Sequence, residues 1–302
     1  MTKIIITGAT GFVGSSLTKF LLDKKKFEIY LIVREGSNLL NINSIMNSVH
    51  IFTYNGELNN LIEYFQEVKP DIIFHLASSF IAEHESNEIN SLIESNITFG
   101  LHLLEAMKVS ETKKIINTGT SWQHYNNEDY NPVCLYAATK QAFEALIEYY
   151  VQADSFKVIT LKLFDTYGEN DHRPKLINLL DKFANEQTEL NMTPGKQQIS
   201  LVHISDVCEA FYLASKIINN DDFLKSKSYA IRGEIDFNLK QVVQIFEDVS
   251  SKKLNINWGN KLYRKREVMK LWQNCEILPN WQPKISLREG LVKILNKNFT
   301  HE

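Results

Sequence analysis

The hydrophobic pattern of this chain alternates between short apolar runs and longer segments in which apolar residues recur every three or four positions. Strands buried on both faces of a parallel sheet have uninterrupted apolar runs, whereas amphipathic helices have the longer spacing. The alternation predicts an α/β fold with a Rossmann-like, doubly wound parallel sheet. The predicted strands cover residues 3–6, 28–33, 49–54, 71–78, 113–121 and 157–163.

The first predicted strand runs directly into a turn that contains Gly8, Gly11 and Gly14, and helical periodicity follows. We expect Gly8 to permit the tight turn, Gly11 to let a phosphate approach the backbone, and Gly14 to let the helix pack closely on the sheet. Backbone N–H groups and the positive helix end would then meet at one point, which favours a pyrophosphate. The alternative is an ordinary glycine-rich loop, because G-x-x-G-x-x-G differs from the common G-x-G-x-x-G motif.

Two strand ends add to this predicted dinucleotide site. Arg34 ends the second strand, where a carboxylate favours the ribose hydroxyl of NAD and an arginine favours the extra phosphate of NADP. Arg34 therefore predicts NADP(H) over NAD(H); the alternative is a surface residue beside a turn. The fourth strand ends in Ala77 and Ser78, whose small side chains leave room for a ligand at this edge of the sheet. His75 in the same strand is interpreted as a packed strand residue.

A tyrosine and a lysine, Tyr136 and Lys140, are four residues apart in a segment of helical periodicity. Residues at this spacing share a helix face, so the ammonium can lie beside the phenol. A nearby cation lowers the pKa of a tyrosine from about 10 and makes it a usable general acid or base. The fifth predicted strand ends in hydroxyl residues, including Thr120 and Ser121, before this helix.

Together the T-G-A-T-G-F-V-G turn, the hydroxyl-tipped strand and Y-x-x-x-K resemble the short-chain dehydrogenase/reductase superfamily, in its extended epimerase/dehydratase branch of nucleotide-sugar enzymes. The resemblance implies a catalytic triad of Ser121, Tyr136 and Lys140, with Thr120 as the fallback hydroxyl, and it implies that Lys140 also holds the nicotinamide ribose. The cofactor-binding residues expected on these grounds are Gly8, Thr10, Gly11, Phe12, Val13, Gly14, Arg34, Ala77, Ser78, Thr118, Tyr136 and Lys140.

The residues after Ser121 are Trp122 and Gln123, where the resembling 4,6-dehydratases have Asp-Glu. Neither side chain can do acid–base work, so dehydration is disfavoured. We expect Trp122 and Gln123 to shape the sugar pocket; a packed Trp122 is the alternative.

The resemblance continues into the second half of the chain with departures at two positions that implied phosphate contacts. Asp165 replaces an asparagine in R-x-x-N-x-Y-G, and Ile199 replaces an arginine in G-x-Q-x-R-D-F. Lys175, at the start of a predicted helix, is one expected diphosphate ligand, with simple surface charge as the alternative. Arg264 is the other, because Arg264 to Glu267 resembles the late R-x-x-E of the family. The substrate-binding residues expected in all are Trp122, Gln123, Asp165, Lys175 and Arg264.

These features predict a dinucleotide-binding Rossmann domain over residues 1–165 and a small mixed α/β substrate lobe over 166–302, with some segments returning to the main domain. The predicted function is NADPH-dependent reduction of a CDP- or dTDP-linked 4-keto-6-deoxy sugar, and the finer sequence context resembles reductases of CDP-linked 3,6-dideoxyhexoses. The alternatives are an NAD-dependent nucleotide-sugar 4-epimerase and a non-catalytic NADP-sensing protein.

Composition limits the other possibilities. A chain of 302 residues with 44% hydrophobic residues can form a sizeable core, and its net charge of −3 gives no reason to expect a nucleic-acid partner. Cys134, Cys208 and Cys275 are widely separated, which indicates neither a disulfide framework nor a metal site and fits the cytoplasm. We expect no signal peptide and no membrane association. The family resemblance implies a homodimer.

Overall fold

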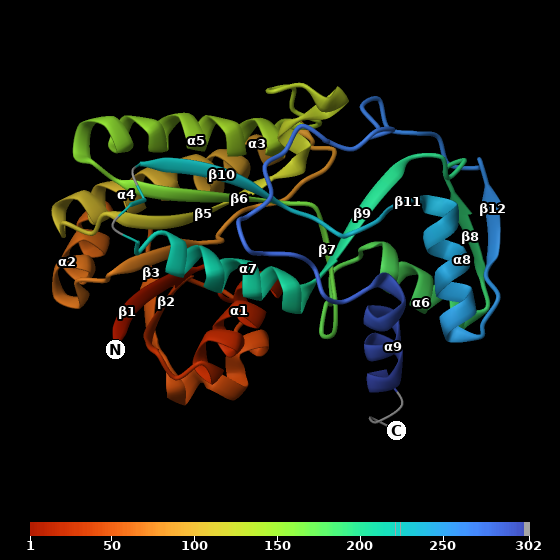
Figure 1. The fold of residues 1–302 in the computed structure, drawn as a ribbon, viewed down its shortest axis with the longest axis horizontal. Helices are drawn as coiled ribbons and strands as arrows, with labels where there is room; N and C mark the ends of the chain where they lie inside the picture. Colours follow the sequence, from red (N-terminus) through yellow and green to blue (C-terminus); the bar gives the residue numbers. More distant parts are fainter. Residues whose placement is uncertain (221, 224, 299–302) are drawn as a thin grey trace.

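A seven-stranded parallel sheet in the order β10-β6-β5-β4-β1-β2-β3 forms the centre of the larger lobe (Figure 1). The computed structural model describes residues 1–220, 222–223 and 225–298. The arrangement confirms the predicted doubly wound fold. The strands are β1 (Thr2–Thr7), β2 (Phe27–Arg34), β3 (His50–Tyr54), β4 (Ile72–His75), β5 (Lys114–Thr120), β6 (Lys157–Leu163) and β10 (Ser226–Ile231).

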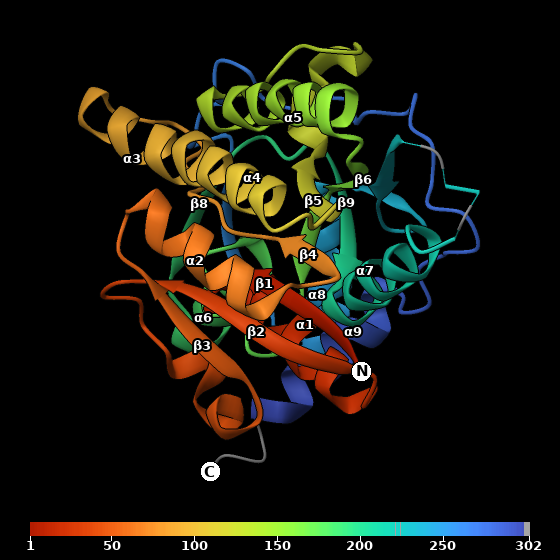
Figure 2. The same ribbon diagram turned by 90° about the vertical axis from the view of Figure 1, so that its left-hand side faces the viewer.

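Helices cover both faces of this sheet (Figures 1 and 2). Alternate residues of a strand point to opposite faces. Ile4 and Ile6 therefore pack in one core cluster with α1 and α7, while Ile5 packs in the other with α2, α4 and α5. Burial on both sides explains why β1 is a continuous apolar run. The helices are α1 (Phe12–Asp23) and α7 (Ile204–Ile217) on the first face, and α2 (Leu58–Val68), α4 (Phe99–Val109) and α5 (Leu135–Asp154) on the second.

The helical segment between β4 and β5 is divided in the structure. A π-helical turn at Glu94–Thr98 separates α3 (Ile89–Ile93) from α4. Asn96 in this turn is buried, and its amide donates to the Ser79 carbonyl at 3.1 Å and to Thr139 Oγ1 at 2.9 Å. The π-helical turn thus directs the Asn96 side chain inward, where it holds the loop that follows β4. Further short helical turns are Leu40–Ser48, Ser86–Glu88, Ser121–Gln123 and Tyr125–Asn127.

A smaller lobe follows β6 at the carboxyl ends of the main strands (Figure 1). It has a three-stranded sheet, β11-β9-β7, and a two-stranded parallel sheet, β12-β8, and its own buried cluster of side chains. The elements are β7 (Asp165–Tyr167), α6 (Leu176–Glu186), β8 (Glu189–Met192), β9 (Gln198–His203), β11 (Asp236–Asn238), α8 (Leu239–Ser250), β12 (Asn255–Trp258) and α9 (Leu287–Asn298).

The chain crosses between the lobes more than once. Although they follow residue 165, α7 and β10 pack with the main sheet. A segment without regular helices or strands, residues 259–286, then runs back across the molecule, and we call it the C-terminal strap. Trp272 of the strap packs with Phe164, and the Trp281 indole donates to the Asp206 carbonyl at 3.0 Å. The Leu271 N–H of the strap also donates to Gln198 Oε1 on β9 at 3.2 Å, so the strap contacts both lobes.

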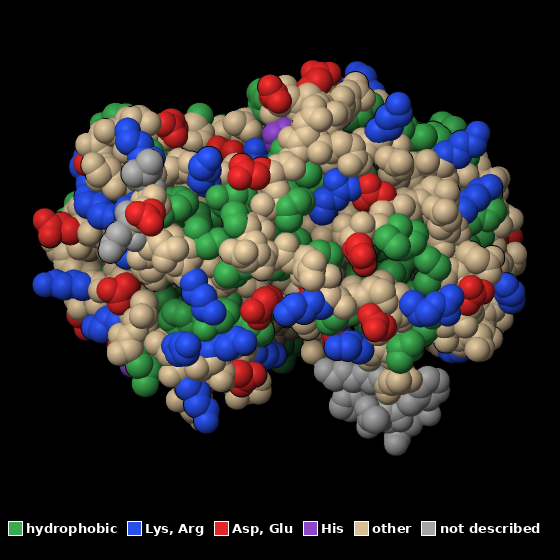
Figure 3. Space-filling model, viewed as in Figure 1, with side chains coloured by type: hydrophobic (Ala, Val, Ile, Leu, Met, Phe, Trp, Pro, Cys, Tyr) green, Lys and Arg blue, Asp and Glu red, His purple; other side chains and the backbone are tan. Residues whose placement is uncertain are grey.

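In Figure 3, lysine and arginine side chains are interspersed with aspartate and glutamate over most of the face, and several of them gather at its lower left. Among the described residues, no helix is long and apolar enough to cross a membrane. Within the same residues, His, Cys, Asp and Glu side chains do not gather in any group of three that could hold a metal ion.

Candidate active site

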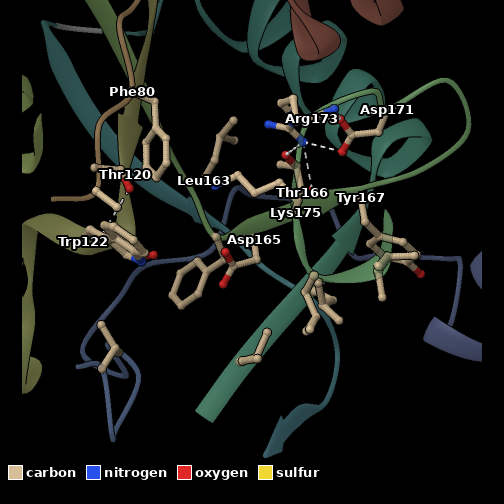
Figure 4. A pocket seen from close by; sticks show the side chains of 18 of the residues that line it. Phe80, Thr120, Trp122, Leu163, Asp165, Thr166, Tyr167, Asp171, Arg173 and Lys175 are labelled. Carbon is tan, nitrogen blue, oxygen red and sulfur yellow. Dashed lines mark hydrogen bonds and ion pairs between the residues drawn. The ribbon is translucent and has the colours of Figure 1, made fainter. Parts of the chain in front are cut away.

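A cleft of about 710 Å³ lies between the two lobes, at the carboxyl ends of the main strands. Open parallel sheets bind their ligands at this edge. Its inner part is lined by the glycine turn, the end of β5 and the start of α5, and its outer part by β7, α6, β8 and the strap. In Figure 4, Asp165 lies between Phe80 and Trp122 on one side and Lys175 and Arg173 on the other.

The glycine turn at the inner end has the geometry that the sequence predicts. Gly8 has φ +71°, and the Gly11 N–H donates to the Gly8 carbonyl at 3.1 Å. A Cβ on Gly14 would lie 2.1 Å from the Gly8 oxygen, so only glycine lets α1 approach the strand end so closely. A Cβ on Gly8 would lie 2.6 Å from the Ala77 nitrogen, which adds a packing role that the sequence did not reveal.

Most of the expected cofactor residues line this cleft, but three of them do not. Arg34 is exposed at the end of β2, with Nη1 3.4 Å from Ser95 Oγ. The Thr10 carbonyl accepts from Asn41, and the Ala77 N–H donates to the Thr7 hydroxyl. Thr10, Arg34 and Ala77 thus lie outside the lining of the cavity. The residues that do line it are Gly8, Gly11, Phe12, Val13, Gly14, Ser78, Thr118, Tyr136 and Lys140.

Tyr136, Lys140 and Ser121 line the same cavity as the glycine turn. Tyr136 and Lys140 are buried on the first turns of α5, 8% and 3% exposed. Ser121 opens the short turn that follows β5, and the neighbouring Thr120 hydroxyl accepts from the Trp122 N–H at 3.3 Å. Because Thr120 already caps this turn, Ser121 is the better placed of the two hydroxyls to meet a ligand.

Burial dominates the electrostatics of this group. It raises the pKa of Tyr136, an effect that the negative charge of a Cys134 thiolate would increase and a hydrogen bond from Ser78 opposes. Burial also lowers the pKa of Lys140 to about 8, although the negative charge of Glu144 opposes this shift. The pKa of Tyr136 is therefore raised in this structure and not lowered as expected, because desolvation of the phenolate is the largest influence on it. At neutral pH the phenol keeps its proton and Lys140 remains mostly charged.

His75 lies behind this group as a packed strand residue, as expected. Its Nδ1 is 2.9 Å from the Thr7 hydroxyl, and its carbonyl accepts from Thr118 at 2.8 Å. Burial, with the Lys140 charge, lowers the pKa of His75 to about 3. The imidazole is therefore neutral and supports the strand ends that the cleft is built on.

Gln123 is the one expected substrate residue that the structure turns away from the cleft. Its side chain is fully buried, with Oε1 accepting from the Thr120 N–H at 2.9 Å. Its amide donates to Gln141 at 2.7 Å and to Glu144 at 2.8 Å. With these contacts made, Gln123 holds the Ser121 turn against α5, and we do not retain it as a substrate ligand. Trp122, Asp165, Lys175 and Arg264 do line the cavity.

An aromatic wall beside the phenol includes Phe80, which the sequence analysis missed. The Phe80 ring centroid is 4.9 Å from that of Tyr136 and 5.6 Å from that of Trp122. The Lys175 ammonium lies 3.9 Å above the Phe80 ring, and the Arg264 guanidinium lies 5.0 Å above Trp122. A phenylalanine in an irregular loop gives no sequence signal that separates a pocket wall from core packing.

Three basic side chains at the outer cleft, Arg173, Lys175 and Arg264, each face an acid. Arg264 pairs with Glu267 at 2.9 Å, and Arg173 pairs with Asp171 at 2.7 Å. Burial raises the pKa of Asp165, while the charge of Lys175 is the strongest influence that opposes this shift. The subsite is therefore close to electrically neutral, in contrast to a purely basic phosphate site.

Comparison with known proteins agrees with this geometry. The family model "NAD dependent epimerase/dehydratase family" matches residues 4–226. CDP-abequose synthase from Yersinia pseudotuberculosis is 28% identical over 271 residues, which cover 88% of this chain and 90% of that protein. CDP-abequose synthase from Salmonella muenchen is 25% identical over 297 residues, or 97% of each chain.

Solved structures share the fold over the whole chain. UDP-glucose 4-epimerase from Thermotoga maritima with UDP-glucose has a TM-score of 0.84 at 19% identity, and both chains are covered completely. UDP-glucuronic acid 4-epimerase from Bacillus cereus, in complex with UDP-glucuronic acid and NAD, has a TM-score of 0.84 at 21% identity, also over both complete chains. With its glycine turn, its parallel sheet and a family match over most of its length, the chain belongs to the NAD dependent epimerase/dehydratase family.

Proposed function

We propose that this protein uses NADPH to reduce the ketone of a CDP- or dTDP-linked 4-keto-6-deoxy sugar. The observation that carries the proposal is the meeting of Ser121, Tyr136 and Lys140 with the glycine turn in one cleft. Two relatives are named CDP-abequose synthase, so they act on a CDP-linked sugar, and one of them aligns with 97% of this chain. Trp122 and Gln123, where dehydratases carry acids, argue against dehydration.

The residues present fit a dinucleotide. A Cβ at Gly11 would meet only the Gly8 carbonyl, at 3.4 Å, so there is open space at Gly11, beside the N-terminus of α1, that a phosphate can enter. NADPH supplies the hydride when it is bound. Tyr136 then gives its proton to the ketone oxygen, and Ser121 donates a hydrogen bond to the same oxygen. Lys140 stabilises the phenolate that remains, provided that its amine is protonated.

The proposed cofactor preference depends on Arg34, which is exposed and whose guanidinium makes a long 3.4 Å hydrogen bond to Ser95 Oγ. We expect NADPH to bind more tightly than NADH. Arg34→Glu should weaken NADPH binding by roughly ten- to a hundredfold, because a hydrogen bond to a charged group contributes about 1.5–3 kcal/mol. Fluorescence titration with both cofactors measures the ratio. Equal affinity of the wild-type protein for NADPH and NADH would contradict the assignment.

Asp165 provides a test of the diphosphate subsite. Asp165→Asn should lower the KM for the nucleotide sugar by roughly three- to tenfold. The negative carboxylate lines the cleft and would repel the negative diphosphate of the substrate, whereas the amide would not. Protonation has the same effect as the substitution. The wild-type KM should therefore fall as pH falls through the raised pKa of Asp165, while the KM of the variant stays flat. A higher KM in Asp165→Asn would mean that the carboxylate binds the substrate.

A 4-epimerase is the second candidate, and the close structural likeness to two 4-epimerases favours it. An epimerase keeps its cofactor through the cycle, whereas a reductase consumes it. Steady loss of NADPH absorbance with a keto sugar supports the reductase. Inversion of a UDP-sugar without net change in the cofactor would support the epimerase instead. Binding of NADPH without either reaction would support a sensing protein.

A further inference from the structure

A chain of buried polar groups lies directly beneath the catalytic residues. Glu144 follows Lys140 by one turn of α5, and its Oε1 accepts from the Gln123 amide at 2.8 Å. Its Oε2 lies 3.4 Å from the ammonium of Lys162 on β6. The same ammonium donates to His124 Nε2 at 2.9 Å. The Lys162 and Glu144 side chains are only 7% and 17% exposed.

The fold makes room for this chain and covers it. A Cβ on Gly119 would lie 3.0 Å from Gln123 Oε1, Glu144 Oε1 and Lys162 Cγ, so glycine leaves the space that these groups fill. On the other side the His124 ring stacks on Trp272 of the strap, with centroids 3.8 Å apart. A buried ion pair is weak evidence for stability, because desolvation offsets its attraction. Its place beside Lys140 indicates another role.

The charges around Lys140 do not balance. The Lys162 ammonium pairs with the carboxylate of Glu144, whose negative charge also acts on Lys140 one turn earlier in α5. Asp129 acts on the far side of the cluster, through His124. The other titratable groups named here are neutral. Burial lowers the pKa of His75 to about 3 and that of His124 to about 4, and the phenol of Tyr136 keeps its proton. His124 Nε2 accepts a hydrogen bond from Lys162, and Nδ1–H donates to the Glu128 carbonyl at 3.0 Å.

We infer that the Lys162–Glu144 pair sets the charge of Lys140 and through it the proton transfer by Tyr136. Glu144 supports the ammonium of Lys140 in its buried position. Lys162 holds the same carboxylate, so that Glu144 does not neutralise the field of Lys140 at the phenol. Both are positioning residues, because neither lines the cleft. The inference rests on the proposed role of Lys140 as the partner of Tyr136.

The sign of each substitution follows from this arrangement. Glu144→Gln removes the carboxylate that opposes the effect of burial on Lys140, so the titration midpoint of Lys140 should fall below about 8, by about one pH unit or more. Lys162→Met frees the carboxylate and removes a like charge, so the midpoint should rise by about one pH unit. Lys162→Arg keeps the charge and serves as the matched control, with an unchanged midpoint.

The experiment follows the titration of Lys140 by NMR of the full-length protein with isotope-labelled lysine, with the signal assigned by its absence in Lys140→Arg. Opposite shifts in Glu144→Gln and Lys162→Met, with none in Lys162→Arg, support the inference. Unchanged midpoints, or shifts in the same direction, overturn it. If Lys162→Met does not fold, Glu144→Gln decides alone. An unchanged Lys140 midpoint in that variant then overturns the inference. The titration needs no substrate, so an error in the proposed reaction leaves this result intact.

Discussion

Tyr136→Phe is expected to reduce NADPH-dependent turnover by roughly a hundred- to ten-thousandfold, the range that a positioned general acid contributes. The substitution removes only the hydroxyl, and the ring still packs against Phe80 with its centroid 4.9 Å away. Cofactor affinity should therefore stay within about twofold of wild type, since the glycine turn is untouched. Loss of NADPH absorbance measures turnover with CDP- and dTDP-linked 4-keto-6-deoxy sugars, and fluorescence titration measures the affinity.

Two hydroxyl variants serve as controls for this result. Ser121→Ala should lower kcat while leaving cofactor binding intact, because its hydroxyl is assigned to the ketone oxygen. Thr120→Ser keeps the hydroxyl that caps the turn and should retain most of the activity. If Tyr136→Phe loses turnover and cofactor affinity equally, the phenol is structural rather than catalytic.

Gly14→Ala is expected to abolish cofactor binding and to lower the free energy of unfolding. The new Cβ would lie 2.1 Å from the Gly8 carbonyl, a backbone atom that cannot rotate away. Overpacking typically costs about 1–3 kcal/mol, which outweighs the roughly 1 kcal/mol that alanine gains over glycine in a helix. Thermal unfolding measures the first effect, and NADPH titration measures the second.

Gly11→Ala is the matched control at the other face of the same turn. Its Cβ would make only an ordinary 3.4 Å contact with the Gly8 oxygen, so the stability should be close to wild type. The methyl group would still stand in front of the turn, and we expect cofactor affinity to fall by at least about tenfold. A Gly14→Ala protein that keeps both its stability and its affinity would contradict the packing role assigned to this glycine.

The sheet and the glycine turn were predictable because local patterns determine them. Strands such as β1 lie between two layers of helices, so both faces are apolar and the run is continuous. The turn depends on residues close together in the sequence, and two of its three glycines, Gly8 and Gly14, lie where a Cβ would clash with the backbone. For the same reason the predicted cofactor loop and the predicted Tyr136 and Lys140 face one cleft.

Features that depend on distant partners were not predictable. The π-helical turn at Glu94–Thr98 is held by Asn96 through Ser79 and Thr139, which lie far from it in the sequence. Gln123 adjoins Ser121, yet it turns inward because Glu144 and Gln141 offer partners there.

The pKa of Tyr136 also could not be predicted from the sequence spacing of Tyr136 and Lys140. Four residues of separation place Lys140 and Tyr136 on one helix face, but the burial that raises the pKa of the phenol comes from Phe80 and other elements packed around it. Phe80 and the C-terminal strap lie in irregular segments, which carry no periodic signal. Their part in the cleft follows only from the tertiary structure.

The most direct test of the proposed function follows NADPH absorbance while the purified wild-type protein acts on a CDP-linked 4-keto-6-deoxy sugar. We expect one NADPH to be consumed for each ketone reduced, with NADH a poorer donor, and a product that carries a hydroxyl at the former ketone carbon. Unchanged NADPH absorbance with both CDP- and dTDP-linked keto sugars, together with inversion of a UDP-sugar by the same protein, would contradict the account.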